Sequence, residues 1–408
     1  MKALLILSDG IADVPCPQLG GRTPLEAGTN PHLDRLAAEG ITGLMDPLKP
    51  GIPAGSDTAH IAIFGENPFS VYRGRGYLEA LGVGLSPGAD DIGFRVNFGT
   101  VTDGVITDRR AGRDPTGLSE LVRDITREVS LSVPFSLKEA TGTRAALVLK
   151  GSGLSYHLTD GDPHSEGLAP LSVCPSDGSD DASRTAEIVN DFVAQAAEVL
   201  RGHPVNDLRE ARGLLPANYL LVRGAGIRPV VTPLPERYGI SACCIAATAL
   251  IRGVATCFGL DLIDVPGLTG EYNTVLEDRA GYVLEALDAY DFVFVHFKAT
   301  DTASHDGNPL RKVEMIEKLD TFVGRLLAGI DPQKVVVALT GDHTTPCMLG
   351  DHSGEPVPLV LWGGRVRTDD VLSYGERSCA KGGIGRLTAQ DLMPVLMNQA
   401  GRVHKFGE

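Results

Sequence analysis

Aspartate and histidine residues near the C-terminus have the types and spacing of metal ligands. Asp342 and His343 are adjacent, and His352 follows nine residues later in the segment TGDHTTPCMLGDHSG. One carboxylate and two imidazoles suit Zn²⁺, Mn²⁺ or Co²⁺. An Asp-His pair after a strand is more often a hydrogen-bonded turn, so this segment alone does not establish a metal site.

Three apolar runs must position these and further ligand-type side chains. ALLIL, DFVFVH and KVVVAL have the composition of buried strands, and each run ends where polar residues begin. The side chains that follow them are Asp9, Asp301, His305, Asp342, His343 and His352. Because the carboxyl ends of parallel strands meet at one edge of a sheet, we expect these groups to converge. Six ligands exceed the needs of one zinc ion and suit two metals about 3.5–4 Å apart.

A turn rich in glycine and proline, GIPAG, directly precedes Ser56 and the apolar run of a short helix. At a helix N-terminus the backbone N–H groups and the dipole favour an oxyanion and then a phosphate. Ser56 has no general base nearby in the sequence, so as a nucleophile it needs a metal to activate it. The alternative is an ordinary serine cap of the helix.

Length and composition limit the classes of protein to which this chain can belong. A chain of 408 residues with 43% hydrophobic residues predicts two packed domains. The formal net charge of −15 argues against nucleic acid and anionic membrane as main partners, so a small anionic substrate must meet a concentrated basic pocket. The oligomeric state stays open, a homo-oligomer included. Seven cysteines without a CxxC pair, a short N-terminal apolar run and no long apolar segment predict a cytoplasmic protein.

The composition and hydrophobic pattern of the sequence change in the middle of the chain. From about residue 86 to residue 230, short strands mix with polar loops and one amphipathic helix over 186–200. Arginines cluster in YRGRGYLEAL and DRRAGR, and their planar forks suit carboxylate and phosphate. We therefore expect an α/β fold in which 1–85 and 231–408 form a mostly parallel sheet flanked by helices. Residues 86–230 would form a smaller inserted α+β domain.

Long motifs spread over essentially the whole chain resemble one enzyme family. They include NPHLDRLAAEG, GIPAGSDTAHIAIFG, FVHFKATDTASHDG and TGDHTTPCMLGDHSGEPVPL. Together they resemble the archaeal-type branch of cofactor-independent (2,3-bisphosphoglycerate-independent) phosphoglycerate mutase, within the alkaline phosphatase superfamily. The resemblance implies an alkaline-phosphatase-like sheet and an isomerase of glycolysis and gluconeogenesis that needs no 2,3-bisphosphoglycerate.

The resemblance also implies a two-metal site, with Mn²⁺ favoured and Zn²⁺, Co²⁺ and Mg²⁺ open. One metal would be held by Asp301, His305 and His352, and the other by Asp9, Asp342, His343 and Ser56. Ser56 would take the phosphoryl group from 3-phosphoglycerate and return it to the other hydroxyl of the reoriented glycerate. The inserted domain would bind substrate and close over the site as a lid, which excludes the water that hydrolyses phosphoserine.

The substrate-binding positions that the resemblance implies are Arg109, Arg110, Arg144, Asp162 and His164. The loop YHLTDGDPH departs from the family pattern at Tyr156 and Gly161, so the general acid/base for the glycerate hydroxyls stays open between Asp162 and His164. The alternative function is a metal-dependent phosphatase or phosphodiesterase, or a mutase of the same superfamily acting on another phosphorylated metabolite. His60 favours the mutase. A further alternative is a metal-bound binding protein without catalytic activity. In such a protein we would expect one or more of the ligand residues to be missing.

Overall fold

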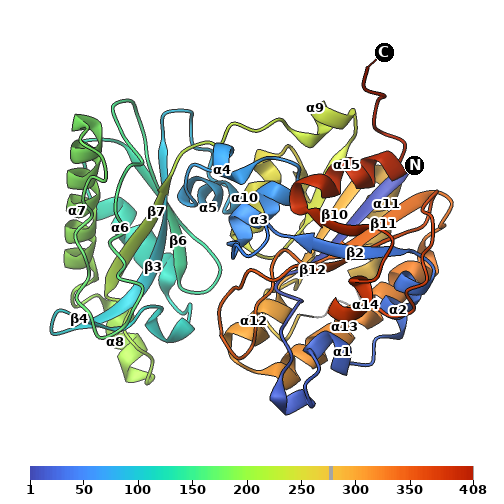
Figure 1. Cartoon of the computed structure of the whole chain (residues 1–408). Coiled ribbons are helices and arrows are strands. Elements are labelled where there is room, and N and C mark those ends of the chain that lie inside the picture. The colour runs from blue at the N-terminus through green and yellow to red at the C-terminus, as the bar shows by residue number, and fades with distance from the viewer. Residues whose placement is uncertain (275–278, 408) are drawn as a thin grey trace. The chain divides into compact units, whose positions relative to one another are not determined.

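The computed structural model describes residues 1–274 and 279–407. The chain divides into two compact units (Figure 1): unit 1 comprises Met1–Tyr72 and Val231–Glu408, and unit 2 comprises Arg73–Val230. The sequence predicts boundaries near residues 86 and 230. The first division lies earlier because helix α5 (Gly76–Gly82) packs directly on strand β3 (Ile92–Thr102). A Cβ built on Gly76 would lie 2.1 Å from the carbonyl oxygen of Gly93, so the two backbones meet without side chains between them.

Unit 1 is built on an eight-stranded sheet with the order β13-β2-β12-β11-β1-β10-β8-β9. Strand β12 runs antiparallel to both of its neighbours, and every other pairing is parallel. The mostly parallel sheet predicted from the apolar runs is therefore confirmed. The strands are β1 (Lys2–Ser8), β2 (Ile41–Asp46), β8 (Ala242–Ile245), β9 (Asp261–Leu262), β10 (Phe292–Phe297), β11 (Val335–Thr340), β12 (Val357–Trp362) and β13 (Gly385–Thr388).

Helices cover both faces of this sheet. Side chains alternate along a strand, so Val293 and Phe294 of β10 point to opposite faces. Val293 packs in the core beside α11 and α13, whereas the Phe294 ring contacts the Phe64 ring at the end of α3. The helices of unit 1 are α1 (Pro24–Ala27), α2 (Pro31–Ala38), α3 (Ser56–Ile63), α4 (Pro68–Val71), α9 (Leu234–Tyr238), α10 (Ala249–Cys257), α11 (Ala280–Ala289), α12 (Ala299–His305), α13 (Pro309–Gly329), α14 (Glu376–Cys379) and α15 (Ala389–Gln399).

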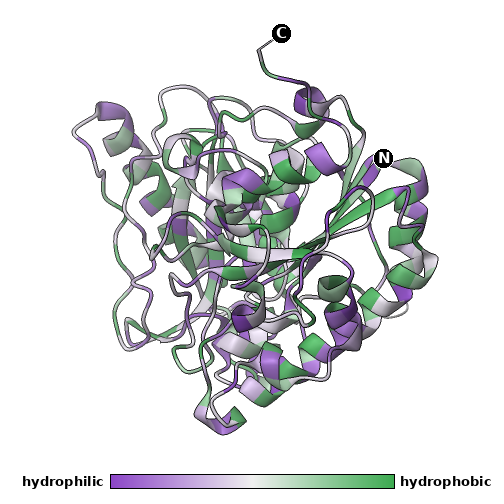
Figure 2. Ribbon diagram, turned by 45° about the vertical axis from the view of Figure 1, so that its right-hand side comes forward, coloured by the Kyte–Doolittle hydropathy of each residue, from purple (hydrophilic) through white to green (hydrophobic). Residues whose placement is uncertain are grey.

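The central strands of unit 1 are buried along their whole length. All six residues of β10 and of β11 are buried, as continuous apolar runs predict for strands covered on both faces. Hydrophobic residues accordingly gather in the strands, while hydrophilic residues are frequent on the helices around them (Figure 2). Among the residues that the structure describes, no helix is both long and apolar enough to cross a membrane.

Unit 2 is an α+β unit on an antiparallel sheet of order β4-β3-β6-β5. Strand β7 pairs with residues 93–99 of β3, on the edge opposite to β6. The amphipathic helix expected over 186–200 begins earlier, at Asp180, because the Ser179 side chain caps it by accepting from the Ala182 N–H. The elements are β3, β4 (Val105–Asp108), β5 (Phe135–Glu139), β6 (Arg144–Leu149), β7 (Tyr219–Gly226), α5, α6 (Leu118–Glu128), α7 (Asp180–Leu200) and α8 (Pro204–Ala211).

Candidate metal centre

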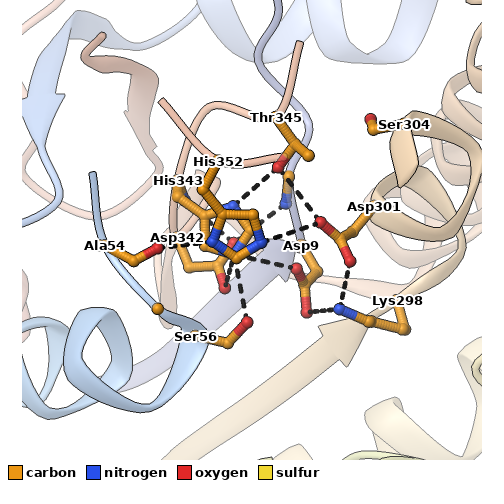
Figure 3. Close-up of polar contacts among 12 residues, drawn as sticks. Asp9, Ala54, Ser56, Lys298, Asp301, Ser304, Asp342, His343, Thr345 and His352 are labelled. Carbon is orange, nitrogen blue, oxygen red and sulfur yellow. Dashed lines mark hydrogen bonds and ion pairs between the residues drawn. The ribbon is translucent and has the colours of Figure 1, made fainter. Parts of the chain in front are cut away.

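The predicted ligand residues of unit 1 converge at the carboxyl ends of three neighbouring strands. In the sheet Ser8 pairs with Phe297 and Leu7 pairs with Thr340, so β1, β10 and β11 end at the same level. Asp9 follows β1 directly, helix α12 after β10 carries Asp301 and His305, and the loop after β11 carries Asp342, His343 and His352. Figure 3 shows most of these side chains pointing toward one another.

Asp9 is buried and is held by two cationic or polar donors. Its Oδ2 accepts from Nε2 of His296 and from Nζ of Lys298, each at 3.0 Å, while its Oδ1 has no hydrogen-bond partner. Burial alone would raise the pKa of Asp9, but Lys298 and His296 outweigh it and hold this pKa well below its usual value. The carboxylate is therefore ionised, and one of its oxygens is available for a further cation.

Asp342 and His343 form the second part of the centre. Oδ1 of Asp342 accepts from the backbone N–H groups of Gly10 and His343, each at 3.0 Å. Its Oδ2 is buried without a hydrogen-bond partner and lies 3.2 Å from Nε2 of His343. Burial lowers the pKa of His343, but Asp342 and Asp9 outweigh it and raise this pKa to about 9. Two carboxylates thus surround one imidazole nitrogen.

A threonine hydroxyl fixes the orientation of the His343 ring. Oγ1 of Thr345 lies 2.9 Å from Nδ1 of His343 and donates to Oδ1 of Asp301 at 3.2 Å. Because the hydroxyl proton goes to Asp301, the hydroxyl oxygen must accept from Nδ1–H of His343. This contact directs Nε2 toward the carboxylates, the orientation that a metal-ligating histidine requires.

A second cluster consists of Asp301, His305 and His352. Nε2 of His305 lies 3.4 Å from Oδ2 of Asp301, and Nε2 of His352 lies 3.7 Å from Oδ1 of the same carboxylate. Nδ1 of His305 donates to the Gly350 carbonyl at 2.7 Å, and Nδ1 of His352 donates to the Ala54 carbonyl at 2.6 Å. Both rings therefore direct Nε2 toward Asp301.

Ser56 is the first residue of α3 and lies against this centre. Its hydroxyl is 3.2 Å from Nε2 of His343, and the residue is 9% exposed. The N-cap of the helix is Gly55, so Ser56 does not cap its own helix, which is the alternative that the sequence left open. Its hydroxyl is instead directed toward the ligand cluster (Figure 3).

The donor set fits divalent metal ions. Among the residues that the structure describes, two groups bring their ligand atoms within 4.8 Å of one another: Asp301, His305 and His352 form one, and Asp9, Asp301 and His343 form the other. The buried, unpartnered oxygens of Asp9 and Asp342 are atoms that a cation would satisfy. Asp301 takes part in both groups, whereas the division implied by the family resemblance assigns it to one metal.

Lys298 and His296 also belong to this centre, although neither is predicted from the sequence. The Lys298 ammonium donates to Asp9 and to Asp301, so it bridges carboxylates of the two groups. Burial lowers the pKa of Lys298, but the charges of Asp301 and Asp9 outweigh it and raise this pKa above its usual value. His296 belongs to β10 and to the apolar run that predicts this strand, and Lys298 directly follows the strand. Their position at a strand end, next to predicted acidic ligands, was the available signal.

In unit 2 the predicted substrate-binding residues form an arginine-rich network. Arg109 makes a two-pronged ion pair with Asp162, at 3.0 Å to Oδ1 and 2.6 Å to Oδ2. Burial raises the pKa of Asp162, but Arg109 outweighs it and lowers this pKa. His164 lies between Oδ2 of Asp160 at 3.0 Å and Nη1 of Arg223 at 3.1 Å.

Further arginines surround this network in unit 2. Burial lowers the pKa of Arg144 to about 10, and the charges of Arg110, Arg75 and Arg223 add to that effect against the opposing charge of Glu79. Burial also lowers the pKa of Arg95, and the charges of Arg75, Arg144 and Arg223 add to that effect. The sequence analysis missed Arg95 and Arg223 because each stands alone within a strand. One buried and several half-buried arginines together form a site suited to an anion.

Comparisons with known proteins place the chain in a family. The family model described as the metalloenzyme superfamily matches residues 1–399. A 2,3-bisphosphoglycerate-independent phosphoglycerate mutase from Thermococcus kodakarensis is 50% identical over 100% of this chain and 99% of its own length. The protein of the same name from Methanopyrus kandleri is 48% identical over 100% of this chain and 98% of its own length.

Solved structures extend the likeness to the fold. A structure from Pyrococcus horikoshii superposes with a TM-score of 0.88 at 41% identity and covers 100% of this chain and 99% of that chain. The cofactor-independent phosphoglycerate mutase from Thermoplasma acidophilum gives a TM-score of 0.69 at 36% identity, over 98% of this chain and 100% of that chain. The full-length match, the fold and the ligand cluster lead to one conclusion: the chain belongs to the metalloenzyme superfamily and, within it, to the 2,3-bisphosphoglycerate-independent phosphoglycerate mutases.

Proposed function

We propose that this protein interconverts 3-phosphoglycerate and 2-phosphoglycerate through a phosphoserine at Ser56, without 2,3-bisphosphoglycerate. The observation that carries the mechanism is the position of the Ser56 hydroxyl, 3.2 Å from Nε2 of His343 and beside two carboxylates with unpartnered oxygens. A serine at a helix N-terminus next to such ligands has the surroundings of a phosphoryl acceptor. The enzyme would serve glycolysis and gluconeogenesis in the cytoplasm.

Two divalent metals would complete the site, with Mn²⁺ favoured over Zn²⁺, Co²⁺ and Mg²⁺. The residues proposed to hold them are Asp301, His305 and His352 for one metal, and Asp9, Asp342, His343 and Ser56 for the other. Bound metals would supply Lewis-acid activation of the serine hydroxyl and neutralise charge on the phosphoryl oxygens. Because Asp301 lies within reach of both groups, its carboxylate would keep the two metals close together.

The chain's own residues prepare the transfer in three ways. The first turn of α3 directs its backbone N–H groups toward the phosphoryl group on Ser56. Thr345 keeps Nε2 of His343 facing the serine hydroxyl. Lys298 places a fixed positive charge against Asp9 and Asp301, which lowers the electrostatic cost of gathering anionic groups in a buried site.

Unit 2 would bind the substrate and act as the lid. Arg109, Arg110 and Arg144 would supply positive charge for the carboxylate and phosphate of phosphoglycerate. Asp162 is kept ionised by Arg109, so its proposed role is to orient this arginine. His164 is 51% exposed at its side chain, and it is the better candidate to move a proton at the glycerate hydroxyls.

An enolase-coupled assay tests the function. Chelated protein is resupplied with single metals in the absence of 2,3-bisphosphoglycerate, and the formation of 2-phosphoglycerate is followed. We expect activity with Mn²⁺ and a phosphorylated Ser56 that mass spectrometry detects after rapid acid quenching. Ser56→Ala should lose both, and retained interconversion would overturn the mechanism. Release of inorganic phosphate that outpaces 2-phosphoglycerate would identify a phosphatase instead.

A further inference from the structure

A fully buried lysine ammonium contacts the two loops that carry ligand-type residues of the candidate metal centre. Lys312 belongs to α13 and is 0% exposed. Its Nζ donates to the carbonyl of Ala12 at 2.9 Å, to Oδ2 of Asp13 at 2.9 Å and to the carbonyl of Thr345 at 3.0 Å. An ammonium has three N–H donors, so each donor has one acceptor in this arrangement.

The three acceptors come from two separate loops. Ala12 and Asp13 belong to the loop after β1, which begins with the ligand-type residue Asp9. Thr345 belongs to the loop after β11, which begins with Asp342 and His343. The ammonium therefore joins the two loops through hydrogen bonds to two backbone carbonyls and to one carboxylate.

Other contacts show that the loops meet at this point. The Thr345 N–H donates to the Ala12 carbonyl at 3.2 Å, and Ala12 pairs with Thr344 in an isolated parallel bridge. Oδ2 of Asp13 also accepts from the N–H of Cys347 at 3.1 Å. The Gly10 N–H, which donates to Asp342, is a further bond between the loops, and the ammonium adds three charge-assisted or charge–dipole bonds to these contacts.

Burying such an ammonium is energetically unfavourable. A charged group taken out of water costs several kcal/mol unless it is paired and fully hydrogen-bonded, and an apolar side chain of similar size is often as stable in its place. Stability of the core alone therefore does not require a lysine here. What an apolar residue could not do is hold two carbonyls and a carboxylate from different loops at one point.

The link continues from Lys312 to the ligand atoms. Thr345, whose carbonyl Lys312 holds, accepts from Nδ1 of His343 and donates to Oδ1 of Asp301 through its hydroxyl. We infer that Lys312 is a positioning residue, which holds the loops after β1 and β11 together so that Asp9, Asp301 and His343 keep the spacing that metal binding requires. This inference rests on the proposed metal sites.

Metal binding and stability measured separately test the inference. Lys312→Met removes the ammonium and keeps the length of the side chain, while Lys312→Met with Asp13→Asn removes both charges of the buried pair. Lys318→Met is the matched control, because Lys318 lies on the same helix and donates to the Tyr272 carbonyl, away from the two loops. Each chelated protein is titrated with Mn²⁺ by calorimetry, and its metal-free thermal unfolding is recorded.

We expect Lys312→Met to bind Mn²⁺ about 10–100-fold more weakly, which is the range found when groups that orient metal ligands are lost. The double variant should regain part of the metal-free stability, because no unpaired carboxylate stays buried, yet it should keep the weakened Mn²⁺ affinity. The visible spectrum of the Co²⁺-loaded double variant should also differ from that of the unchanged protein. Lys318→Met should match the unchanged protein in all three measurements.

Wild-type Mn²⁺ affinity in the double variant would overturn the inference, as would wild-type affinity in Lys312→Met. If Lys312→Met fails to fold, the double variant carries the test. Failure of the proposed function gives a different pattern: the unchanged protein would then bind no divalent metal, or Ser56→Ala would retain interconversion.

Discussion

The imidazole rings of His343 and His352 are stacked, with their centroids 3.6 Å apart and their planes at 22°. Their surroundings nevertheless differ. Two carboxylates raise the pKa of His343 to about 9 against the effect of burial, whereas burial and the nearby His343 lower the pKa of His352. The stack therefore lies at the boundary between the two proposed metal groups, with one ring belonging to each.

Loss of either stacked histidine should empty a different metal site. We expect His343→Ala and His352→Ala each to retain one metal per chain after desalting from excess Mn²⁺, as measured by elemental analysis. Adding His305→Ala separates the two cases. Combined with His352→Ala it should leave one metal bound, because both changes affect the same site, whereas combined with His343→Ala it should leave none. Equal metal content in the two double variants would contradict the division.

Thr345→Val should weaken metal binding while the fold is retained. Valine has nearly the same shape as threonine but cannot accept from Nδ1 of His343 or donate to Asp301. The ring then loses the contact that fixes its tautomer, and we expect about a 10–100-fold loss in Mn²⁺ affinity by calorimetry. Thr345→Ser keeps the hydroxyl and should restore most of the affinity. Equal affinities of the two variants would contradict the role of the hydroxyl, because only Thr345→Ser retains it.

Lys298→Met should destabilise the metal-free protein more than the metal-loaded one. The change leaves Asp9 and Asp301 buried without the ammonium that bridges them. We expect a loss of about 3 kcal/mol in unfolding free energy, at the lower end for a broken buried pair because the Lys298 side chain is 24% exposed. Excess Mn²⁺ should recover much of this loss, as calorimetric melting with chelator and with metal would show. Lys334→Met, at an exposed side chain, is the control.

Glu376 should make stability fall as the pH rises. This partly buried carboxyl accepts from the Asp13 N–H and from the Thr23 hydroxyl, and burial raises its pKa from 4.5 to about 7. The folded state holds a proton that the unfolded state releases at lower pH, so the contribution is full below about pH 4.5 and is lost as the pH rises through about 7.

Glu376→Gln cannot ionise and should escape this loss. Between pH 5 and pH 8 we expect the variant to gain about 2–3 kcal/mol in unfolding free energy relative to the unchanged protein, as measured by urea unfolding. Glu285→Gln, on the exposed surface of α11, should show no such trend. Parallel stability curves for Glu376→Gln and the unchanged protein would contradict the assignment.

The sequence predicted the strands that position the ligands because their burial on both faces leaves continuous apolar runs. Asp9, Asp301 and Asp342 were found because each follows such a run, and strand ends are where α/β sheets place ligands. Lys298 was missed because a search for ligand types passes over a cation, although this cation lies between two carboxylates. Counter-charges within a site follow from three-dimensional neighbours and leave no regular spacing.

The pairing of the strands in unit 2 could not be predicted from the sequence. Arg95 pairs with Arg223 across β3 and β7, and Arg144 pairs with Asn97 across β3 and β6. These residues meet only because antiparallel strands have this register, and register depends on turns and packing that the sequence of each strand alone does not reveal. The clustered Arg109 and Arg110 were visible in the chain and the family resemblance pointed to Arg144, whereas Arg95 and Arg223 were missed.

Gly10 shows how little room the centre leaves. Its φ is +60°, and a Cβ there would lie 2.6 Å from Oγ1 of Thr345 and 2.9 Å from Oδ1 of Asp301. Even a single methyl group would enter the space in which these two oxygens meet, and the left-handed backbone would add strain. In a library that encodes all amino acids at this codon, selection for growth on the enzyme's activity should return glycine alone.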